Sequence, residues 1–456
     1  MRYDKPDLNT SLAKFTYNGQ ELPGEPISEE FLMPGSRIRL GTREKIHAPV
    51  FWNPEDARHL TTPNIAVVGG NDMDNSQMIQ SIALQLLRQK SQSGEPIDLL
   101  LFDGLDGYNE SRTSFVDTIG ARVIRLHKLP LNPFNLRDLE RKPQLHTHSA
   151  MAFADSLARA YDLGSLQKSI LVQSIVAAYA AKGISSDPLS WDLPAPTLED
   201  VYEEYNSRPR SQRSDDLDRA MESLALLDLF DCETPEDLPL YDRIQGPVIL
   251  DMSGYPDAAK HFALSVLLEI LFAQMRCRER TVGHNLRKMI LIDNVDFLLS
   301  AGCPGLEGLL SQGRDFGLGL LLAAHSLDVF QEKSIDCLKW IPAWILHNVE
   351  DLRKKELEIL LQMDIHDSSL ERLYQESRRL RHLHSLICLS GHEPVLAEDL
   401  PFYEIVGDTA QSYLLQTTVQ EPEPLAGMPL LDSTDPDTLV TLDEEIPGLM
   451  DIFEGL

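Results

Sequence analysis

The stretch that decides the fold is Asn64-Ile-Ala-Val-Val-Gly-Gly-Asn-Asp-Met-Asp-Asn-Ser76. It begins with a short apolar run, Asn64 to Val68, which is typical of a strand buried on both faces. A turn with two glycines follows, and Gln77 to Lys90 then repeats apolar residues at helical spacing. The sequence therefore predicts a strand, a glycine turn and a helix in succession.

The turn has the length and position of a phosphate-binding loop, whose pattern is G-x-x-x-x-G-K-(S/T). In such a loop backbone N–H groups surround the phosphates of ATP, the lysine reaches the β- and γ-phosphates, and the hydroxyl holds Mg²⁺. Asp74 replaces the second glycine and Asn75 replaces the lysine. The candidate site for ATP is Gly69, Gly70, Asn71, Asp72, Met73, Asp74, Asn75 and Ser76.

Two carboxylates in this loop oppose nucleotide binding. One carboxylate about 5 Å from a phosphate charge costs roughly 3 kcal/mol at an effective dielectric constant near 20. Asp72 and Asp74 each bring such a charge, and the missing lysine removes a favourable contact of similar size. We therefore expect weak or absent ATP binding and no meaningful turnover at this loop.

A second element, Lys288-Met-Ile-Leu-Ile-Asp-Asn-Val-Asp296, has the order of a strand that ends on an aspartate orienting Mg²⁺. Asp293 stands at that position, so Ser76 and Asp293 are the candidate metal ligands if Mg-ATP binds. The next residue in working sites is usually a glutamate that polarises the attacking water. Here it is Asn294, whose amide cannot act as a base, so the hydrolytic base is missing as well.

Two further residues are candidate catalytic groups. His325 ends the apolar run Gly319 to His325, where an active site of this kind has a polar sensor of the γ-phosphate. Arg314 precedes that run and could reach the nucleotide of a neighbouring subunit as an arginine finger. Each has a simpler interpretation: a strand-end hydrogen bond for His325 and a surface salt bridge for Arg314.

The order of these elements resembles the HerA/FtsK superfamily of ring-forming DNA motors. Within it, the chain is similar to the DptH-type restriction ATPases of DNA phosphorothioation systems, over about Ile38 to Ser390. The resemblance implies a RecA-like core, a helical insertion, and a role in bacterial antiviral defence. The stretches that carry it are Leu129 to Leu136, Val248 to Tyr255, Lys288 to Asp296, Gly313 to Gly319 and Trp344 to Val349.

The predicted fold class is α/β, a RecA-like and mostly parallel sheet flanked by helices, because roughly seven to eight apolar strands alternate with helical patterns. We expect a small β-hairpin ahead of this core. The predicted divisions are an N-terminal arm and hairpin (1–60), the first part of the core (61–140), a helical insertion (141–240), the second part of the core (241–416) and an acidic tail expected to be disordered (417–456).

The charge is strongly acidic and unevenly distributed. The formal net charge is −30, and no Lys or Arg follows Arg381. Such a chain repels a phosphate backbone, so we expect DNA to be handled indirectly, through protein partners.

Apolar residues among acids in 446–456 are typical of a helix that docks on a partner, although a purely solubilising tail is equally consistent. The basic cluster Arg378 to His384 is a further candidate contact, or a solvated helix end.

Other patterns in the sequence limit the class of protein to which the chain can belong. The five cysteines are scattered without a C-x-x-C pair, which favours reduced thiols over zinc or disulfides. No apolar run reaches about 18 residues and the N-terminus lacks the order of a signal peptide, so we expect a cytoplasmic protein without a membrane span. Asp103 and Asp106 form an acidic turn, either solvated or able to bind a metal.

Three functions follow. The first is a degenerate ATPase subunit that acts structurally, or as a regulator, beside an active ATPase or nuclease of a DNA-processing or defence complex. The second is an active ATP-dependent DNA translocase, which Ser76, Asp293 and Arg314 would permit. The third is a non-enzymatic acidic adaptor that captures a partner through its tail.

Overall fold

The computed structural model describes residues 15–17, 20–22, 37–104, 107–108, 113–232, 238–281, 285–331, 337–349, 352–361 and 368–407. The predictions for the acidic tail and for Asp106 lie outside these residues.

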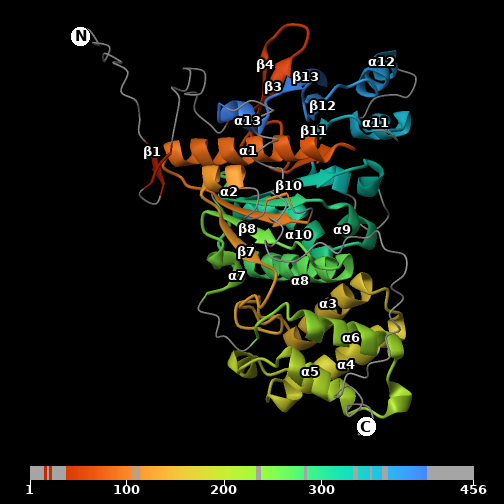
Figure 1. Ribbon diagram of the computed structural model, residues 1–456. Helices are drawn as coiled ribbons and strands as arrows, with labels where there is room; N and C mark the ends of the chain where they lie inside the picture. Colours follow the sequence, from red (N-terminus) through yellow and green to blue (C-terminus); the bar gives the residue numbers. More distant parts are fainter. Residues whose placement is uncertain are drawn as a thin grey trace, which may run out of the picture. The chain divides into compact units, whose positions relative to one another are not determined.

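An 11-stranded mixed sheet forms the centre of the fold (Figure 1). Seven neighbouring strands run parallel. In sheet order they are β11 (Ala343–Leu346), β5 (Ile65–Val68), β10 (Leu318–Ala324), β9 (Lys288–Asp293), β6 (Asp98–Asp103), β8 (Pro247–Asp251) and β7 (Arg122–Arg125). Because both faces of this part are covered, its strands are continuous apolar runs. The predicted RecA-like α/β class is confirmed.

Four antiparallel strands extend the sheet beyond β11. In order they are β12 (His384–Leu389), β13 (Val395–Asp399), β3 (Ile38–Arg43) and β4 (Pro49–Trp52). The predicted hairpin is β3–β4, and it joins the main sheet because β3 pairs with β13. A separate pair, β1 (Phe15–Tyr17) and β2 (Gln20–Leu22), lies in the stretch interpreted as an extended arm.

Helices cover the two faces of the sheet (Figure 1). The sheet divides the core into two apolar clusters, one on each face. One face packs against α1 (Asp72–Gln92), α2 (Thr113–Ile119) and α13 (Phe402–Ile405). The other face is covered by α8 (Asp257–Met275), α9 (Asp296–Ala301), α10 (Pro304–Gln312), α11 (Lys354–Leu361) and α12 (Ser368–Ser377).

The crossover from β7 to β8 carries a block of helices. Its members are α3 (Leu145–Ala160), α4 (Ser165–Ala181), α5 (Leu198–Asn206), α6 (Asp215–Leu227) and α7 (Leu240–Arg243). In Figure 1, α3 lies against α8, with α4, α5 and α6 beyond it. Among the described helices, α8 alone is long and apolar enough to cross a membrane. Its apolar residues are buried between the sheet, α3 and α10, and core packing accounts for them.

Candidate functional site

The candidate loop lies where β5 ends and α1 begins, at the carboxyl edge of the parallel strands. We expected the helix from Gln77, but α1 begins at Asp72, so only three residues separate it from β5. Asn71 caps the helix, since its Oδ1 accepts the Met73 N–H at 3.0 Å. Carboxylates in a first turn also suit the positive end of a helix. A helical turn therefore occupies residues that form an open loop in the phosphate-binding pattern.

Several backbone donors of the loop are bonded within the protein. The Gly69 N–H donates to Ala324 O at 3.0 Å, and the Gly70 N–H donates to Asn348 O at 3.1 Å. The Asn75 N–H donates to Asn71 O at 3.3 Å, inside the helix. These N–H groups are among those that a phosphate cradle turns towards its ligand. In this chain they connect α1 to the ends of β10 and β11.

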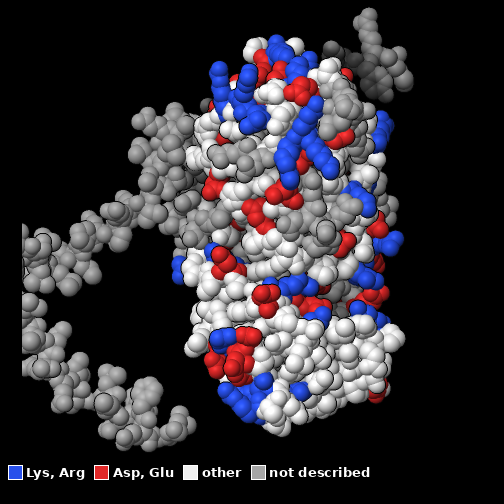
Figure 2. All heavy atoms as spheres, turned by 90° about the vertical axis from the view of Figure 1, so that its right-hand side faces the viewer, with Lys and Arg blue, Asp and Glu red and all other residues white. Residues whose placement is uncertain are grey.

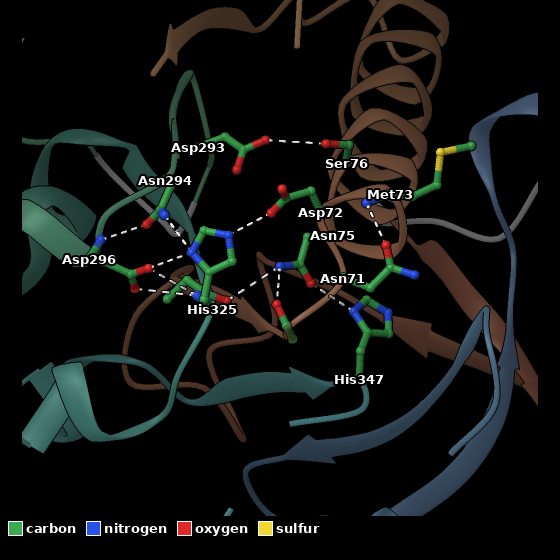
Figure 3. A network of polar contacts seen from close by, with 12 residues as sticks. Asn71, Asp72, Met73, Asn75, Ser76, Asp293, Asn294, Asp296, His325 and His347 are labelled. Carbon is green, nitrogen blue, oxygen red and sulfur yellow. Dashed lines mark hydrogen bonds and ion pairs between the residues drawn. The ribbon is translucent and has the colours of Figure 1, made fainter. Parts of the chain in front are cut away.

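Asn75, which stands at the lysine position, is fixed in a buried chain of polar contacts (Figure 3). Its Nδ2 donates to Gly69 O at 2.9 Å and to Ala324 O at 3.3 Å. Its Oδ1 accepts from His347 Nδ1 at 2.9 Å, and His347 Nε2 lies 3.0 Å from Asp399 Oδ2. Both ring nitrogens of His347 thus face oxygen atoms of buried side chains. Asn75 is a structural link with no donor left for a phosphate.

Gly69 is required by the same chain of contacts. A Cβ added there would lie 2.6 Å from His347 Cβ and 3.0 Å from Asn75 Oδ1. The glycine that matches the phosphate-binding pattern therefore also lets His347 approach the loop.

The two carboxylates of the loop point to different partners. Asp74 is buried, pairs with the His382 ring and accepts the Leu383 N–H at 3.4 Å. Burial has the largest effect on the pKa of Asp74 and raises it, against the opposing charges of His347 and His382. Asp72 is exposed and contacts His325 instead. Asp74 thus anchors the segment before β12 to α1. Asp72 anchors the end of β10 to the same helix.

His325 lies at the carboxyl end of β10, at the mouth of the site (Figure 3). Its Nε2 is 2.6 Å from Asp72 Oδ1 and its Nδ1 is 2.6 Å from Asp296 Oδ2. Burial lowers the pKa of His325, but the carboxylates of Asp296 and Asp72 outweigh it and leave the pKa raised. The Asn294 amide lies beside the ring, 2.6 Å from Nδ1. Three histidines, His325, His347 and His382, therefore hold the first turn of α1.

The candidate metal ligands do lie together. Ser76 Oγ is 3.5 Å from Asp293 Oδ2, and Tyr108, fully buried, donates its hydroxyl to the same Oδ2 at 2.7 Å. Burial, the largest cause, raises the pKa of Asp293 to about 6. Asp103 accepts the N–H groups of Gly107 and Tyr108 at 2.9 and 2.8 Å, which positions the tyrosine. The acidic turn after β6 thus places a neutral donor on Asp293.

The remaining predicted residues are outside this cluster. Arg314 lies ahead of β10, at the opposite edge of the sheet from the loop. Its Nη1 donates to Leu60 O at 2.8 Å and to Thr61 O. Met73 packs against the apolar core on the α1 face. Arg314 is thus held to this chain's own backbone, and Met73 is a packing residue.

The site was tested for its fit to Mg-ATP, which the fold implies. Ser76 and Asp293 are close enough to share a cation, and that part fits. The loop does not fit. The N–H groups of Gly69, Gly70 and Asn75 are bonded internally, and the Asn75 side chain has no free donor. Tyr108 also occupies the Asp293 oxygen nearest Ser76. No step of hydrolysis can be derived from these residues.

The sheet order and the position of the loop define a RecA-like P-loop fold, and comparison with known structures agrees. VirB4 of Thermoanaerobacter pseudethanolicus is similar with a TM-score of 0.61 and 16% identity, covering 81% of this chain and 97% of that chain. The plasmid coupling protein TrwB in complex with ADP and Mg²⁺ gives a TM-score of 0.48 and 13% identity over 81% of this chain and 94% of that one. No protein-family model and no curated protein matches the sequence. The likeness to VirB4 shows the fold alone, and it agrees with the predicted RecA-like α/β fold class.

Proposed function

We propose that this chain is a pseudo-ATPase subunit that acts structurally, or as a regulator, beside an active ATPase or nuclease. The observation that carries the proposal is the loop, in which the first turn of α1 is bonded to residues at the ends of β10 and β11 and to the segment before β12. The chain retains the fold of a motor. Groups of the loop that would donate hydrogen bonds to a nucleotide donate to other residues of the chain instead.

The proposed setting is a cytoplasmic complex that processes DNA or defends against foreign DNA. It rests on the resemblance of the sequence to DptH-type ATPases of phosphorothioation-dependent restriction. The acidic balance supports contact with DNA through partners rather than directly. Residues 446–456 are the proposed partner-binding segment in the tail.

Nucleotide binding and turnover by the purified full chain test the proposal. With millimolar Mg-ATP we expect no heat of binding in calorimetry, no thermal stabilisation and no phosphate release. Turnover that is stimulated by DNA and lost in Asp293→Ala would favour the active translocase instead. Asp251→Ala is the matched control, because Asp251 ends a parallel strand at the same edge but does not contact Asp293 or the loop.

The adaptor hypothesis is tested by deleting residues 420–456 and measuring co-purification with products of neighbouring genes. Loss of every partner would make the tail the main working surface. Retention of an ATPase or nuclease would place the partner contact on the folded part of the chain.

A further inference from the structure

Four arginines lie on α12 or just beyond its end and form what we call the basic turn: Arg372, Arg378, Arg379 and Arg381. All four are exposed. In the described part of the chain none of them makes an ion pair. Figure 2 shows Lys and Arg side chains gathered on the upper part of one face, where Figure 1 places α11 and α12.

The acidic neighbours of the basic turn are already paired. Glu371 bonds Lys354 of α11 at 2.8 Å, and Glu376 lies 3.8 Å from Lys45. Arg378 lies over the Tyr374 ring, 5.8 Å from its centroid, which limits its motion. The negative end of α12 favours cations within its last turn. Arg381 lies beyond that turn, so the helix alone does not account for the cluster.

The basic turn is fixed to the rebuilt loop. The next residue, His382, pairs with Asp74, and the Leu383 N–H donates to the same carboxylate at 3.4 Å. Asn71 Nδ2 lies 3.5 Å from His382 Nδ1. The aspartate that replaces a loop glycine therefore anchors this segment. A surface held in place before binding loses less conformational entropy when a partner docks.

We infer that the basic turn is a docking surface for a short acidic segment of a partner protein. Arginine side chains bind carboxylates through paired N–H donors, and four of them here carry charge that no described residue neutralises. A DNA duplex carries one charge per about 1.7 Å of its axis and extends well past a helix of 10 residues. On a chain of net charge −30 it would meet repulsive surface, whereas a segment of a few residues fits within the turn.

Fluorescence anisotropy with the full chain tests this inference, using a labelled decaglutamate peptide and, separately, a short labelled DNA duplex. At low salt we expect peptide binding that weakens about tenfold in the triple variant R378E/R379E/R381E and weakens further as salt screens the charges. The matched control is R210E/R219E/R280E, which changes the net charge equally on exposed arginines elsewhere. It should bind the peptide like the unmodified chain.

Three outcomes would overturn the inference: no peptide binding at low salt, an equal loss in both triple variants, or tighter binding of the duplex than of the peptide with the same dependence on the basic turn. The last would identify a nucleic-acid surface. The inference extends the proposed function by assigning a partner surface. ATP turnover would refute the pseudo-ATPase assignment and leave the peptide result unchanged.

Discussion

The two halves of the candidate site differ in how their side chains are bonded. In the loop half, each residue that departs from the phosphate-binding pattern has a partner: Asn75 bonds His347, and Asp74 pairs with His382. In the metal half, Asp293 keeps its position beside Ser76, and a tyrosine hydroxyl caps it. In the loop half His347 and His382 oppose the effect of burial on the pKa of Asp74, whereas in the metal half burial raises the pKa of Asp293 to about 6 and makes its carboxylate costly to ionise.

This difference has an energetic meaning. A fully bonded buried polar network adds to stability and fixes a single arrangement. A buried carboxylate with a raised pKa weakens the fold at neutral pH, because the folded state resists its ionisation. Substitutions in the two halves should therefore change stability in opposite directions, and the following predictions test that contrast.

The largest effect is expected from His347→Ala in the loop half. The substitution removes the donor of Asp399 Oδ2 and of the Asn75 carbonyl, and leaves Asp399 only the Ser385 hydroxyl on its other oxygen. Removing one partner of a buried pair costs about 3–5 kcal/mol. Denaturant unfolding of the variant and the unmodified chain, followed by circular dichroism, measures the loss.

A double-mutant cycle with Asp399→Ala separates this contact from simple loss of volume. Because the double variant leaves no unpaired charge, its cost should be about 1–3 kcal/mol smaller than the sum of the single costs. Additive costs would show that His347 and Asp399 do not act as a pair, and the description of the loop half as a bonded network would fail.

In the metal half, Asp293→Asn should make the protein more stable at neutral pH. The pKa of Asp293 is about 6 in the folded chain, against an ordinary value of 3.8 for an aspartate. The protonated Asp293 side chain contributes to the free energy of unfolding. This contribution is fully present below about pH 4 and is lost as the pH rises through about 6. The neutral amide avoids this loss, so the gain should be absent near pH 4 and reach about 2–3 kcal/mol above pH 6. Unfolding free energies across this pH range measure it.

Asp103→Asn is the matched control, since Asp103 is the register neighbour of Asp293 on β6. Its carboxylate accepts two backbone N–H groups, and an amide has only one acceptor oxygen. The same substitution should therefore lower stability by about 1–2 kcal/mol. A loss in both variants would mean that ionised Asp293 is as well supported as Asp103, and the contrast between the halves would disappear.

The sequence predicted the elements that depend on local pattern. The apolar runs that became β5, β9 and β10 were found because buried parallel strands leave a strong signal. The early start of α1 was missed, although Asn71 followed by Asp72 and Asp74 is a signature of a helix beginning. The same residues also match the phosphate-binding pattern, which predicts an open loop there.

Other features depend on the order of strands in the sheet, which local pattern does not specify. Tyr108 and His347 reach the site from the ends of β6 and β11, each far in sequence from the loop, and Asp399 arrives on β13. Tyr108 and Asp399 belong to no motif, and His347 lies in Trp344 to Val349, a stretch that carries the family resemblance but assigns the histidine no role. The pairing of β3 with β13 likewise joins distant segments. Such contacts follow from tertiary packing.

The smallest effect is expected at the mouth between the two halves, where His325 bridges Asp72 and Asp296. The folded pKa of His325 is raised, so its ion pairs add stability below about pH 6.5, and this is lost as pH rises through the folded value. The ring is 37% exposed, and solvent screening limits the contribution to about 0.5–1 kcal/mol. His325→Ala should therefore cost this much near pH 6 at low salt and very little near pH 9, measured as unfolding free energy. An equal loss of unfolding free energy at both pH values would show that His325 acts by packing. The two halves would then be joined at His325 without an ionic bridge.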